Sequence, residues 1–408
     1  MASQGISNDV HKTFRIRTIA GFVNLRKDDF SSAGDLEGKI VAANKAIRSM
    51  EMKLIEDGYE VQTIRIATNP FGEWLEKEIV QKQLAQLDEL LERLHIQFCA
   101  LGPAVNVDEI RRCPAIISAS SRFSCSANVS PTQIVNAKAA ASCFIQLSKM
   151  EEPDFLKGGL GNFRFCATAS CKPWIPFFPA AKSSSNFRDG FVGFAIGLEN
   201  GALAKTLLSK SCSIENISTI FGEGMTVALA PVQKHADEVA LQEKTTFLGI
   251  DTSLNPSLDA GGSVAEAIEC LEEVSIFGGS GTLAAVAAIT MTLQSLPSIK
   301  AVGYCGLMLP VCEDRRLAEI ASNLEPTLRI STILSMSSVC GVGVDTVPIP
   351  GDCSEADLSS LILDVAGLAG RWDKSLSCRV FPIVGSKVGD MTEFDSPYLC
   401  NSKVFAIQ

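Results

Sequence analysis

Histidine is scarce in this chain of 408 residues, where only His11, His95 and His235 are present. Three such widely separated histidines argue against a multi-histidine metal site and against a histidine-dependent serine or cysteine triad. The 14 cysteines form no C-x-x-C pair, and Cys166 and Cys171 have no histidine near them in the sequence. We therefore expect reduced, buried thiols, with no metal and no cofactor.

Long apolar runs and clusters of basic residues are also missing. No apolar run approaches the roughly 20 residues of a membrane helix, and the polar residues 1–13 lack the apolar core of a signal peptide. The formal net charge is -10, and Lys and Arg form no run and do not alternate with aromatic residues. We expect a cytoplasmic protein that binds neither membranes nor nucleic acids.

Short apolar segments alternate with longer amphipathic segments along the whole chain. This pattern predicts an α/β protein with mainly parallel strands covered by helices, a flexible tail at 1–13 and one domain at 14–408. The expected strands are 14–23, 60–68, 95–101, 115–120, 163–169, 191–198, 246–250, 300–305, 342–347 and 377–384. The alternation alone fits a closed barrel and an open, doubly wound sheet equally well.

One irregular segment, 151–188, interrupts the alternation and is rich in Gly, Pro, Ser and Phe. Long loops of this kind often carry function. Its candidate site residues are Asn162, Arg164, Phe177, Phe178 and Lys182. Aromatic side chains beside Arg and Lys are typical of a pocket for an acidic small molecule, although ordinary loop packing is the alternative. We expect this segment to lie across one mouth of the fold.

Acidic residues accompany two of the predicted strands. Asp251 and Ser253 follow the strand at 246–250, and Asp345 and Asp352 belong to the strand at 342–347 and the turn after it. In parallel α/β folds the carboxyl ends of strands border the ligand crevice. Each carboxylate could be a general base, and we expect all three to share one cavity, although Asp also favours turns and caps.

A glycine-rich turn opens a predicted helix at Gly279, Ser280, Gly281 and Thr282. The free N–H groups and the dipole of such a helix end can hold a phosphate or a carboxylate. The spacing matches neither a P-loop nor a dinucleotide fingerprint, so a tight turn capped by one of the two hydroxyls is the alternative. We expect these amides to share a pocket with Arg164 and Lys182.

Two further residues are candidates on weaker grounds. Cys125 follows a strand-like stretch and could be a nucleophile, although no partner base is apparent and a buried structural thiol is the alternative. Arg379 in the last predicted strand could hold a substrate or pair with a surface carboxylate.

Several unusual motifs occur in order through the second half of the chain. They are Gly249-Ile250-Asp251-x-Ser253-x-x-Pro256, Gly262-Ser263-Val264-Ala265, Gly281-Thr282, Leu309-Pro310-Val311-x-Glu313-Asp314, Gly343-Val344-Asp345, Pro348-Ile349-Pro350-Gly351-Asp352, Arg379-Val380-x-Pro382 and Gly385-x-Lys387-Val388-Gly389-Asp390, with Asn162-Phe163-Arg164-Phe165 and Pro176-Phe177-Phe178-Pro179-Ala180-Ala181 upstream. In these motifs the chain resembles the domain of unknown function 711 family. Where the family pattern has Tyr-His after Pro-Ala-Ala, this chain has Lys182-Ser183.

The resemblance implies a closed, pyruvate formate-lyase-like barrel of about ten strands. It does not imply glycyl-radical chemistry, because no adjacent cysteine pair and no Arg-Val-x-Gly-Tyr motif occur. Our leading hypothesis is a cofactor-independent lyase, isomerase or hydrolase that acts on a small anionic or polar metabolite in the barrel mouth. The alternative is a non-catalytic small-molecule-binding or regulatory protein on the same barrel. A homodimer is expected in either case.

Overall fold

The strands of the computed structural model form one mixed sheet in the order β7-β6-β1-β2-β3-β4-β5-β9-β8. The structure describes residues 13–186 and 190–407, so most of the expected flexible tail lies outside the described residues. The strands are β1 (Arg15–Val23), β2 (Ile64–Ala67), β3 (Phe98–Ala104), β4 (Phe123–Asn128), β5 (Phe165–Ala169), β6 (Val192–Glu199), β7 (Thr246–Asp251), β8 (Val342–Pro350) and β9 (Leu376–Ile383).

The sheet consists of two halves that run in opposite directions. Strands β1 to β5 are parallel to one another, as are β6 with β7 and β8 with β9. The halves meet at the antiparallel pairs β1–β6 and β5–β9. At one end of the sheet, therefore, the amino ends of β1 to β5 lie beside the carboxyl ends of β6 to β9.

Among the described residues, the two edge strands β7 and β8 do not pair with each other and are linked through isolated bridges of the segment 300–310. The N–H of Val302 donates to the carbonyl of Ile250 at 3.0 Å, and Pro310 bridges to Asp345. The expected strand at 300–305 does not form, because Gly303 (φ 97°) and Cys305 (φ 48°) adopt left-handed conformations that interrupt the pleat. The nine-stranded sheet is accordingly open, and the expected closed barrel is not what the strand pairing forms.

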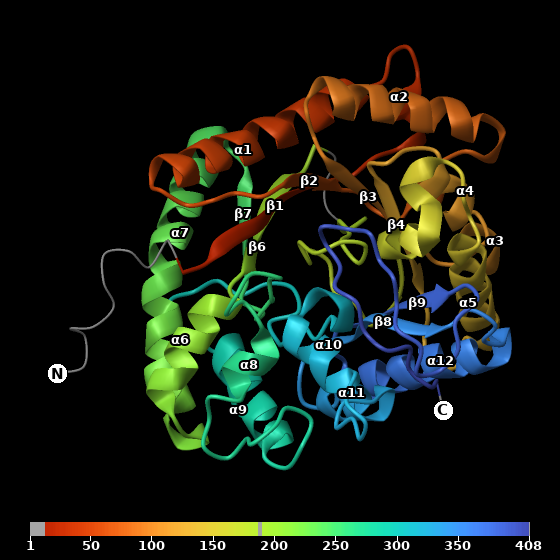
Figure 1. Cartoon of the computed structure of the whole chain (residues 1–408). Helices are drawn as coiled ribbons and strands as arrows, with labels where there is room; N and C mark the ends of the chain where they lie inside the picture. Colours follow the sequence, from red (N-terminus) through yellow and green to blue (C-terminus); the bar gives the residue numbers. More distant parts are fainter. Residues whose placement is uncertain (1–12, 187–189, 408) are drawn as a thin grey trace.

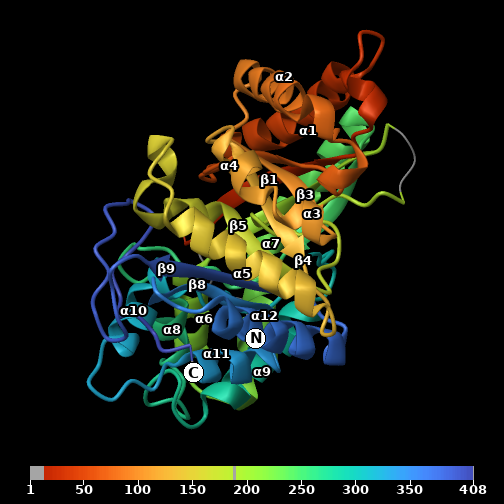
Figure 2. The same cartoon turned by 90° about the vertical axis from the view of Figure 1, so that its right-hand side faces the viewer.

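Helices cover the outer side of the curved sheet (Figures 1 and 2). The α-helices are α1 (Leu36–Glu56), α2 (Val80–Arg93), α3 (Val107–Ile110), α4 (Cys113–Ser118), α5 (Ile134–Ser148), α6 (Gly201–Ser211), α7 (Gly222–Glu243), α8 (Val264–Ile268), α9 (Thr282–Gln294), α10 (Arg315–Ala321), α11 (Ile330–Ser337) and α12 (Glu355–Trp372). In α1, for example, Ile40, Ile47 and Leu54 recur at helical spacing and are fully buried. Among the described residues no helix is long and apolar enough to cross a membrane.

Two sequence-based assignments are wrong in an informative way. Residues 115–120, predicted as a strand, form most of α4, and the neighbouring strand begins at Phe123. A short apolar run does not distinguish a strand from a buried helix, and Pro114 in the first turn of α4 favours the helix. The amphipathic pattern of residues 71–94 predicts one long helix. The structure has two 3-10 turns there (Phe71–Glu73 and Lys77–Ile79), followed by α2.

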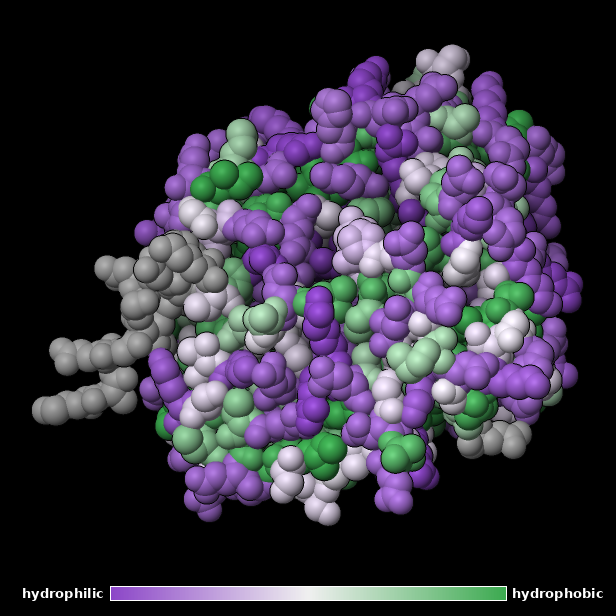
Figure 3. All heavy atoms as spheres, viewed as in Figure 1, coloured by the Kyte–Doolittle hydropathy of each residue, from purple (hydrophilic) through white to green (hydrophobic). Residues whose placement is uncertain are grey.

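The outer surface mixes polar and apolar residues over the face shown in Figure 3. The irregular segment 151–188 contains a kinked 3-10 helix, η5 (Asp154–Arg164), then β5 and a loop. Residues from η5 and from the loop line the cavity described below. The segment thus lies against the end of the sheet where the two halves expose opposite strand ends.

Candidate functional site

A cavity of about 350 Å³ lies at the end of the sheet where amino ends of one half meet carboxyl ends of the other. Its aromatic wall comes from Phe98, Phe155, Phe163, Phe177, Phe178, Tyr304 and Tyr398. Its charged residues are Arg17, Arg65, Arg164, Glu313, Asp345, Arg379 and Asp395. Ligand pockets in proteins are commonly this size and similarly combine apolar walls with a few polar groups.

The most tightly organised part of the cavity is an ion triad from β8, β9 and the 3-10 turn η8 (Val311–Glu313). The Arg379 guanidinium donates from Nε to Asp345 Oδ1 at 2.5 Å and from Nη2 to Glu313 Oε1 at 2.8 Å. It also lies 4.9 Å from the ring centroid of Phe163. All three charged side chains are largely buried, so their attraction is screened less than it would be at the surface.

Burial and the shared cation act in opposite directions on this triad. Burial raises the pKa of Glu313, Arg379 lowers it and Asp345 raises it again, so that the pKa lies above its ordinary value. Burial alone would lower the pKa of Arg379, but Asp345 and Glu313 raise it. Arg379 therefore stays charged, whereas Glu313 is the member of the triad best suited to gain and lose a proton.

Arg65 on β2 is held differently. Its guanidinium lies between two rings, 5.2 Å from the centroid of Phe98 and 5.0 Å from that of Phe178, and its Nε donates to Thr63 Oγ1 at 2.9 Å. No carboxylate oxygen of the described residues lies within 4.0 Å of it. Burial and the neighbouring Arg17 lower the pKa of Arg65 to about 9, so the group still carries its charge at neutral pH.

Arg164 at the end of η5 is similar. Its guanidinium stacks 5.2 Å from the ring centroid of Phe155 and donates to the carbonyl of Ser121. Burial lowers its pKa to about 10, and within the described part of the chain it too has no carboxylate within 4.0 Å. Arg17, in contrast, donates to Glu199 at 3.2 Å.

Five of the residues predicted from the sequence line this one cavity: Arg164, Phe177, Phe178, Asp345 and Arg379. Their elements are far apart in the chain and meet because β5, β9 and β8 are adjacent in the sheet. Of the predicted aromatic wall beside Arg and Lys, the cavity contains Arg164, Phe177 and Phe178 but not Lys182. The roles of these residues remain predictions.

Asp251, Ser253 and Asp352 do not line the cavity, so the expectation that three aspartates share it is not met. Asp251 is fully buried and accepts hydrogen bonds from Ser253 Oγ at 2.6 Å and from the N–H groups of Tyr304 and Cys305. It thereby fastens the segment 300–310 to β7. Asp352 is exposed in the turn after β8.

Cys125, Asn162 and Lys182 also lie outside the cavity. Cys125 packs toward α4, where its thiol lies 3.9 Å from the carbonyl of Cys113, because alternate residues of β4 point to opposite faces. Asn162 is fully buried and donates to the carbonyl of Phe144 at 3.2 Å. Burial lowers the pKa of Lys182, which is partly offset by Cys171.

The glycine-rich turn at 278–282 belongs to a different part of the molecule. Gly279 and Thr282 line a separate shallow cavity beside α11, so the expected pocket shared with Arg164 and Lys182 does not exist. The N-cap of α9 is Gly281, at φ 87°, with no side-chain cap, and Ser280 is exposed. Neither hydroxyl therefore caps the helix in the way that the alternative interpretation supposed.

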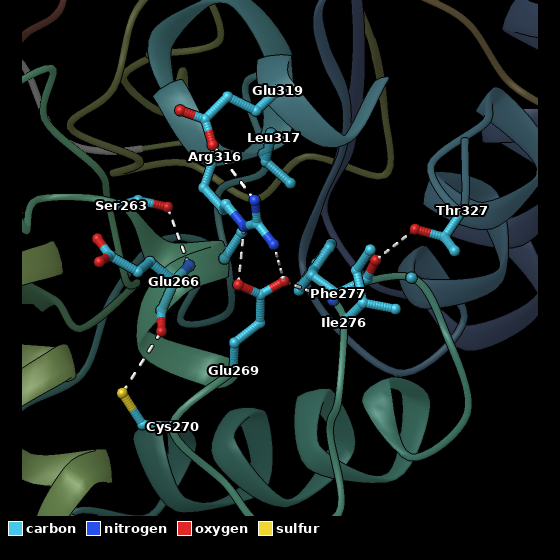
Figure 4. A network of polar contacts seen from close by, with 12 residues as sticks. Ser263, Glu266, Glu269, Cys270, Ile276, Phe277, Arg316, Leu317, Glu319 and Thr327 are labelled. Atoms are coloured by element: carbon cyan, nitrogen blue, oxygen red, sulfur yellow. Dashed lines mark hydrogen bonds and ion pairs between the residues drawn. The ribbon is translucent and has the colours of Figure 1, made fainter. Parts of the chain in front are cut away.

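Figure 4 shows how the approach to this turn is held by a polar network. Arg316 donates from Nε and Nη2 to Glu269, at 2.8 and 3.2 Å, and Glu269 accepts from the N–H of Phe277 at 2.9 Å. Ser263 caps α8 by accepting from the N–H of Glu266. This helix cap and this ion pair hold the local backbone in place, so we interpret the region as structural support.

Among the cavity residues that were not predicted as site residues, four are polar or charged groups that bear on its chemistry: Arg17, Arg65, Ser124 and Glu313. The sequence-based search looked at carboxyl ends of strands, but the first three lie near the amino ends of β1, β2 and β4. A usable signal was present: Arg65 interrupts an apolar strand between two fully buried isoleucines. Such a charge, on the inner face of a strand, is costly unless it has a partner or a ligand.

The described residues contain no group of three or more His, Cys, Asp or Glu side chains arranged to hold a metal ion. The cavity offers instead a set of guanidinium donors and two buried carboxylates. These groups suit binding of an anion and transfer of a proton.

Comparison with known proteins gives a family. The family model described as "Uncharacterised ACR (DUF711)" matches residues 10–396. A UPF0210 protein of Pyrobaculum islandicum is 27% identical over 360 residues, covering 84% of this chain and 78% of that protein. One of Acetivibrio thermocellus is 26% identical over 404 residues, covering 93% and 88%. One of Leuconostoc mesenteroides is 36% identical over 254 residues, covering 58% and 53%.

Proposed function

The chain belongs to the DUF711 family, and from its cavity we propose that it is a cofactor-independent enzyme that moves a proton on a small anionic metabolite. The reaction classes that fit are those of a lyase, an isomerase or a hydrolase. The observation that carries the proposal is the position of Glu313, a carboxyl group whose pKa burial raises. It lies in the same cavity as guanidinium groups that have no carboxylate partner among the residues that the structure describes.

In this proposal the residues divide the work. An anionic group of the substrate is bound by Arg65, whose planar fork is kept in place by Phe98 and Phe178. Glu313 accepts a proton from the substrate and returns it, because a raised pKa brings the group nearer the working pH. Arg379 bonds to both Glu313 and Asp345 and so stabilises the carboxylate form whenever the proton leaves.

The test uses Glu313→Gln beside Glu319→Gln, a substitution of an exposed acid on α10. Small acids that co-purify with the protein are identified by mass spectrometry, and the protein is then incubated with them in D2O. We expect wild type and E319Q to exchange or convert the acid, and E313Q to lose about a hundredfold or more of that rate while still binding it. Equal rates in E313Q and wild type would remove Glu313 from the mechanism.

A non-catalytic binding or regulatory role is the second candidate. The observation that favours it is that both buried carboxylates already bond to Arg379, so their function could be only to hold that guanidinium in the wall. In that case the co-purified acid would bind to wild type and E313Q alike, and neither protein would exchange its hydrogens.

We also propose that the fold is a barrel of the pyruvate formate-lyase-like kind. Support comes from two antiparallel halves and from the segment 300–310. This segment is hydrogen-bonded to Ile250 of β7 and to Leu254 beyond the end of β7, and it bridges to β8. In hydrogen exchange, protection of the Val302 and Met308 amides equal to that of β7 would favour closure. Rapid exchange of both would favour an open sheet.

Finally, we propose a cytoplasmic homodimer with no nucleic-acid partner. The acidic net charge supports the absence of nucleic-acid binding. The adjacent helices α1 and α7 expose Met52, Ile55, Val227 and Leu241, which suits a contact between two copies. Sedimentation of wild type and of Leu241→Glu would test the dimer: the variant should be monomeric.

A further inference from the structure

The four arginines of the cavity fall into two groups. Arg17 and Arg379 have carboxylate partners within the chain, namely Glu199, and Glu313 with Asp345. Arg65 and Arg164 have none within 4.0 Å among the described residues. Both residues are half-buried, and desolvation lowers the pKa of each guanidinium. Because a charge withdrawn from water is normally paired, two unpaired guanidinium groups in one cavity indicate that a ligand supplies their counter-charges.

The two unpaired groups share a second feature. Each stacks on phenyl rings, Arg65 on Phe98 and Phe178 and Arg164 on Phe155, at centroid distances of 5.0 to 5.2 Å. Stacking holds the guanidinium plane while leaving its edge free to donate. Arg65 uses its Nε on Thr63, so neither of its terminal nitrogens has an acceptor within the described part of the protein.

The positions of Arg65 and Arg164 in the sheet determine how far apart the two guanidinium groups are anchored. Arg65 lies on β2 and Arg164 immediately precedes β5, with β3 and β4 between them in the sheet. Three strand spacings correspond to roughly 14 Å at the backbone, and both long side chains line the same cavity. The wall between them is apolar, from Phe98 and Phe155, with one hydroxyl, Ser124 Oγ, that has no hydrogen-bond partner among the described residues.

We propose that the substrate is a dianion with two carboxylate-like groups at the ends of an apolar body, one bound by Arg65 and the other by Arg164. The inference rests on the proposed function in that it names the substrate class of the same cavity. A monoanion would leave one of these half-buried guanidinium groups without a counter-charge. Asp395 also lines the cavity, but it is exposed and contributes its charge at the rim.

The experiment measures binding by calorimetry and needs no knowledge of the reaction. The probes are linear dicarboxylates from succinate to sebacate, each beside the monocarboxylate of the same carbon number. Wild type should prefer one chain length of the dicarboxylate, and should bind it roughly ten- to a hundredfold more tightly than its monocarboxylate, since one charged hydrogen-bonded pair contributes that much.

The variants are Arg65→Met and Arg164→Met, with Arg93→Met as the control, an exposed arginine on α2. Each cavity variant should bind the preferred dicarboxylate only as well as the monocarboxylate, a loss of roughly ten- to a hundredfold. Arg65→Lys should recover part of the loss, because it restores the charge without the fork. R93M should bind as wild type does.

The outcomes separate the two proposals. If wild type binds mono- and dicarboxylates equally and R164M is unchanged, the dianion is wrong and a single anion site at Arg65 is left. If R65M is unchanged as well, with each variant folded by circular dichroism, the anion-binding part of the proposed function also fails. If the dianion binds as expected but E313Q exchanges hydrogens as fast as wild type, only the proposed proton transfer fails.

Discussion

Two adjacent acids, Glu313 and Asp314, occupy opposite kinds of environment. Asp314 is fully buried and its carboxylate accepts from Ser263 Oγ and from the backbone N–H groups of Val264, Arg316 and Leu317. It thereby joins the first turns of α8 and α10. Glu313 lines the cavity, and within the described part of the chain its carboxylate accepts from one side chain, Arg379. The first acid is satisfied by the backbone, whereas the second faces the space where a ligand would lie.

The same contrast separates two arginines. Arg379 is neutralised by two acids of the chain, and Arg65 by none of the described residues. Burial raises the pKa of both Asp314 and Glu313, so a shifted pKa alone does not identify the functional acid. The hydrogen-bond partner identifies the functional acid. An acid bonded to backbone N–H groups is held in one place, whereas an acid that lines the cavity and bonds to a side chain can still exchange a proton with a ligand.

The largest effect should come from Arg379→Met. The substitution leaves Glu313 and Asp345 buried together without their cation, and breaking such a pair from one side is strongly destabilising. We expect a loss of about 3–5 kcal/mol in the free energy of unfolding, measured by urea denaturation. Arg93→Met should change it little, since its ion pair is exposed. A loss in R379M no larger than that in R93M would show that the triad is not an energetic unit.

Asp314→Asn should have the next largest effect. The substitution replaces one carboxylate oxygen by an amide NH2 group, which is a donor. This donor would face the backbone N–H groups at the start of α8 or α10, and no hydrogen bond can form between two donors. We expect a loss of about 2–4 kcal/mol from the missing caps and unsatisfied groups. Glu313→Gln next to it should be milder, because Asp345 still pairs with Arg379. If the two variants lose the same free energy of unfolding, the two acids do not differ in the way that their hydrogen-bond partners indicate.

The fold could be predicted as far as local pattern specifies it. Strand and helix alternation gave the α/β class and most elements, because burial periodicity is a local property. The run 115–120 was misassigned, since it is short and apolar throughout. The gap between β7 and β8 was not foreseen either, because it depends on left-handed residues such as Cys305 that no pattern marks.

The site was predicted in part for a related reason. Sequence patterns identified three of the residues. Asp345 and Arg379 are charged residues in predicted strands, and Arg164 belongs to an irregular segment that contains aromatic and basic residues. Arg65 was not predicted because the rule that sites lie at the carboxyl ends of strands holds when all strands are parallel. Here the halves are antiparallel, and this relation between strands far apart in the chain is set by tertiary packing.

A pH titration of stability would sharpen the comparison for Glu313. A carboxyl group whose pKa is raised on folding binds more protons in the folded state, so stability is fully present below the ordinary value of 4.5 and falls as pH rises through the raised pKa. The stability of wild type relative to E313Q should therefore decline over that window, by no more than about 1.4 kcal/mol per pH unit. Denaturant midpoints at successive pH values measure it. A difference that grows with pH would mean that Arg379 lowers the pKa of Glu313 more than burial raises it.

The smallest expected effect on stability, and the one of opposite sign, belongs to Arg65→Met. If the guanidinium has no counter-charge until a ligand binds, the ligand-free fold bears the desolvation of an unpaired cation. Methionine keeps the bulk between Phe98 and Phe178 and makes sulfur–aromatic contacts of its own, which offset the lost cation–π contacts. R65M should thus be more stable than wild type by about 1 kcal/mol or less while losing the anionic ligand. Thermal unfolding of both proteins, with and without the co-purified acid, measures the two changes together. The prediction is wrong if R65M unfolds at a lower temperature than wild type and the acid still raises its unfolding temperature. Arg65 would then resemble Arg379, a charge that groups of the chain itself already satisfy.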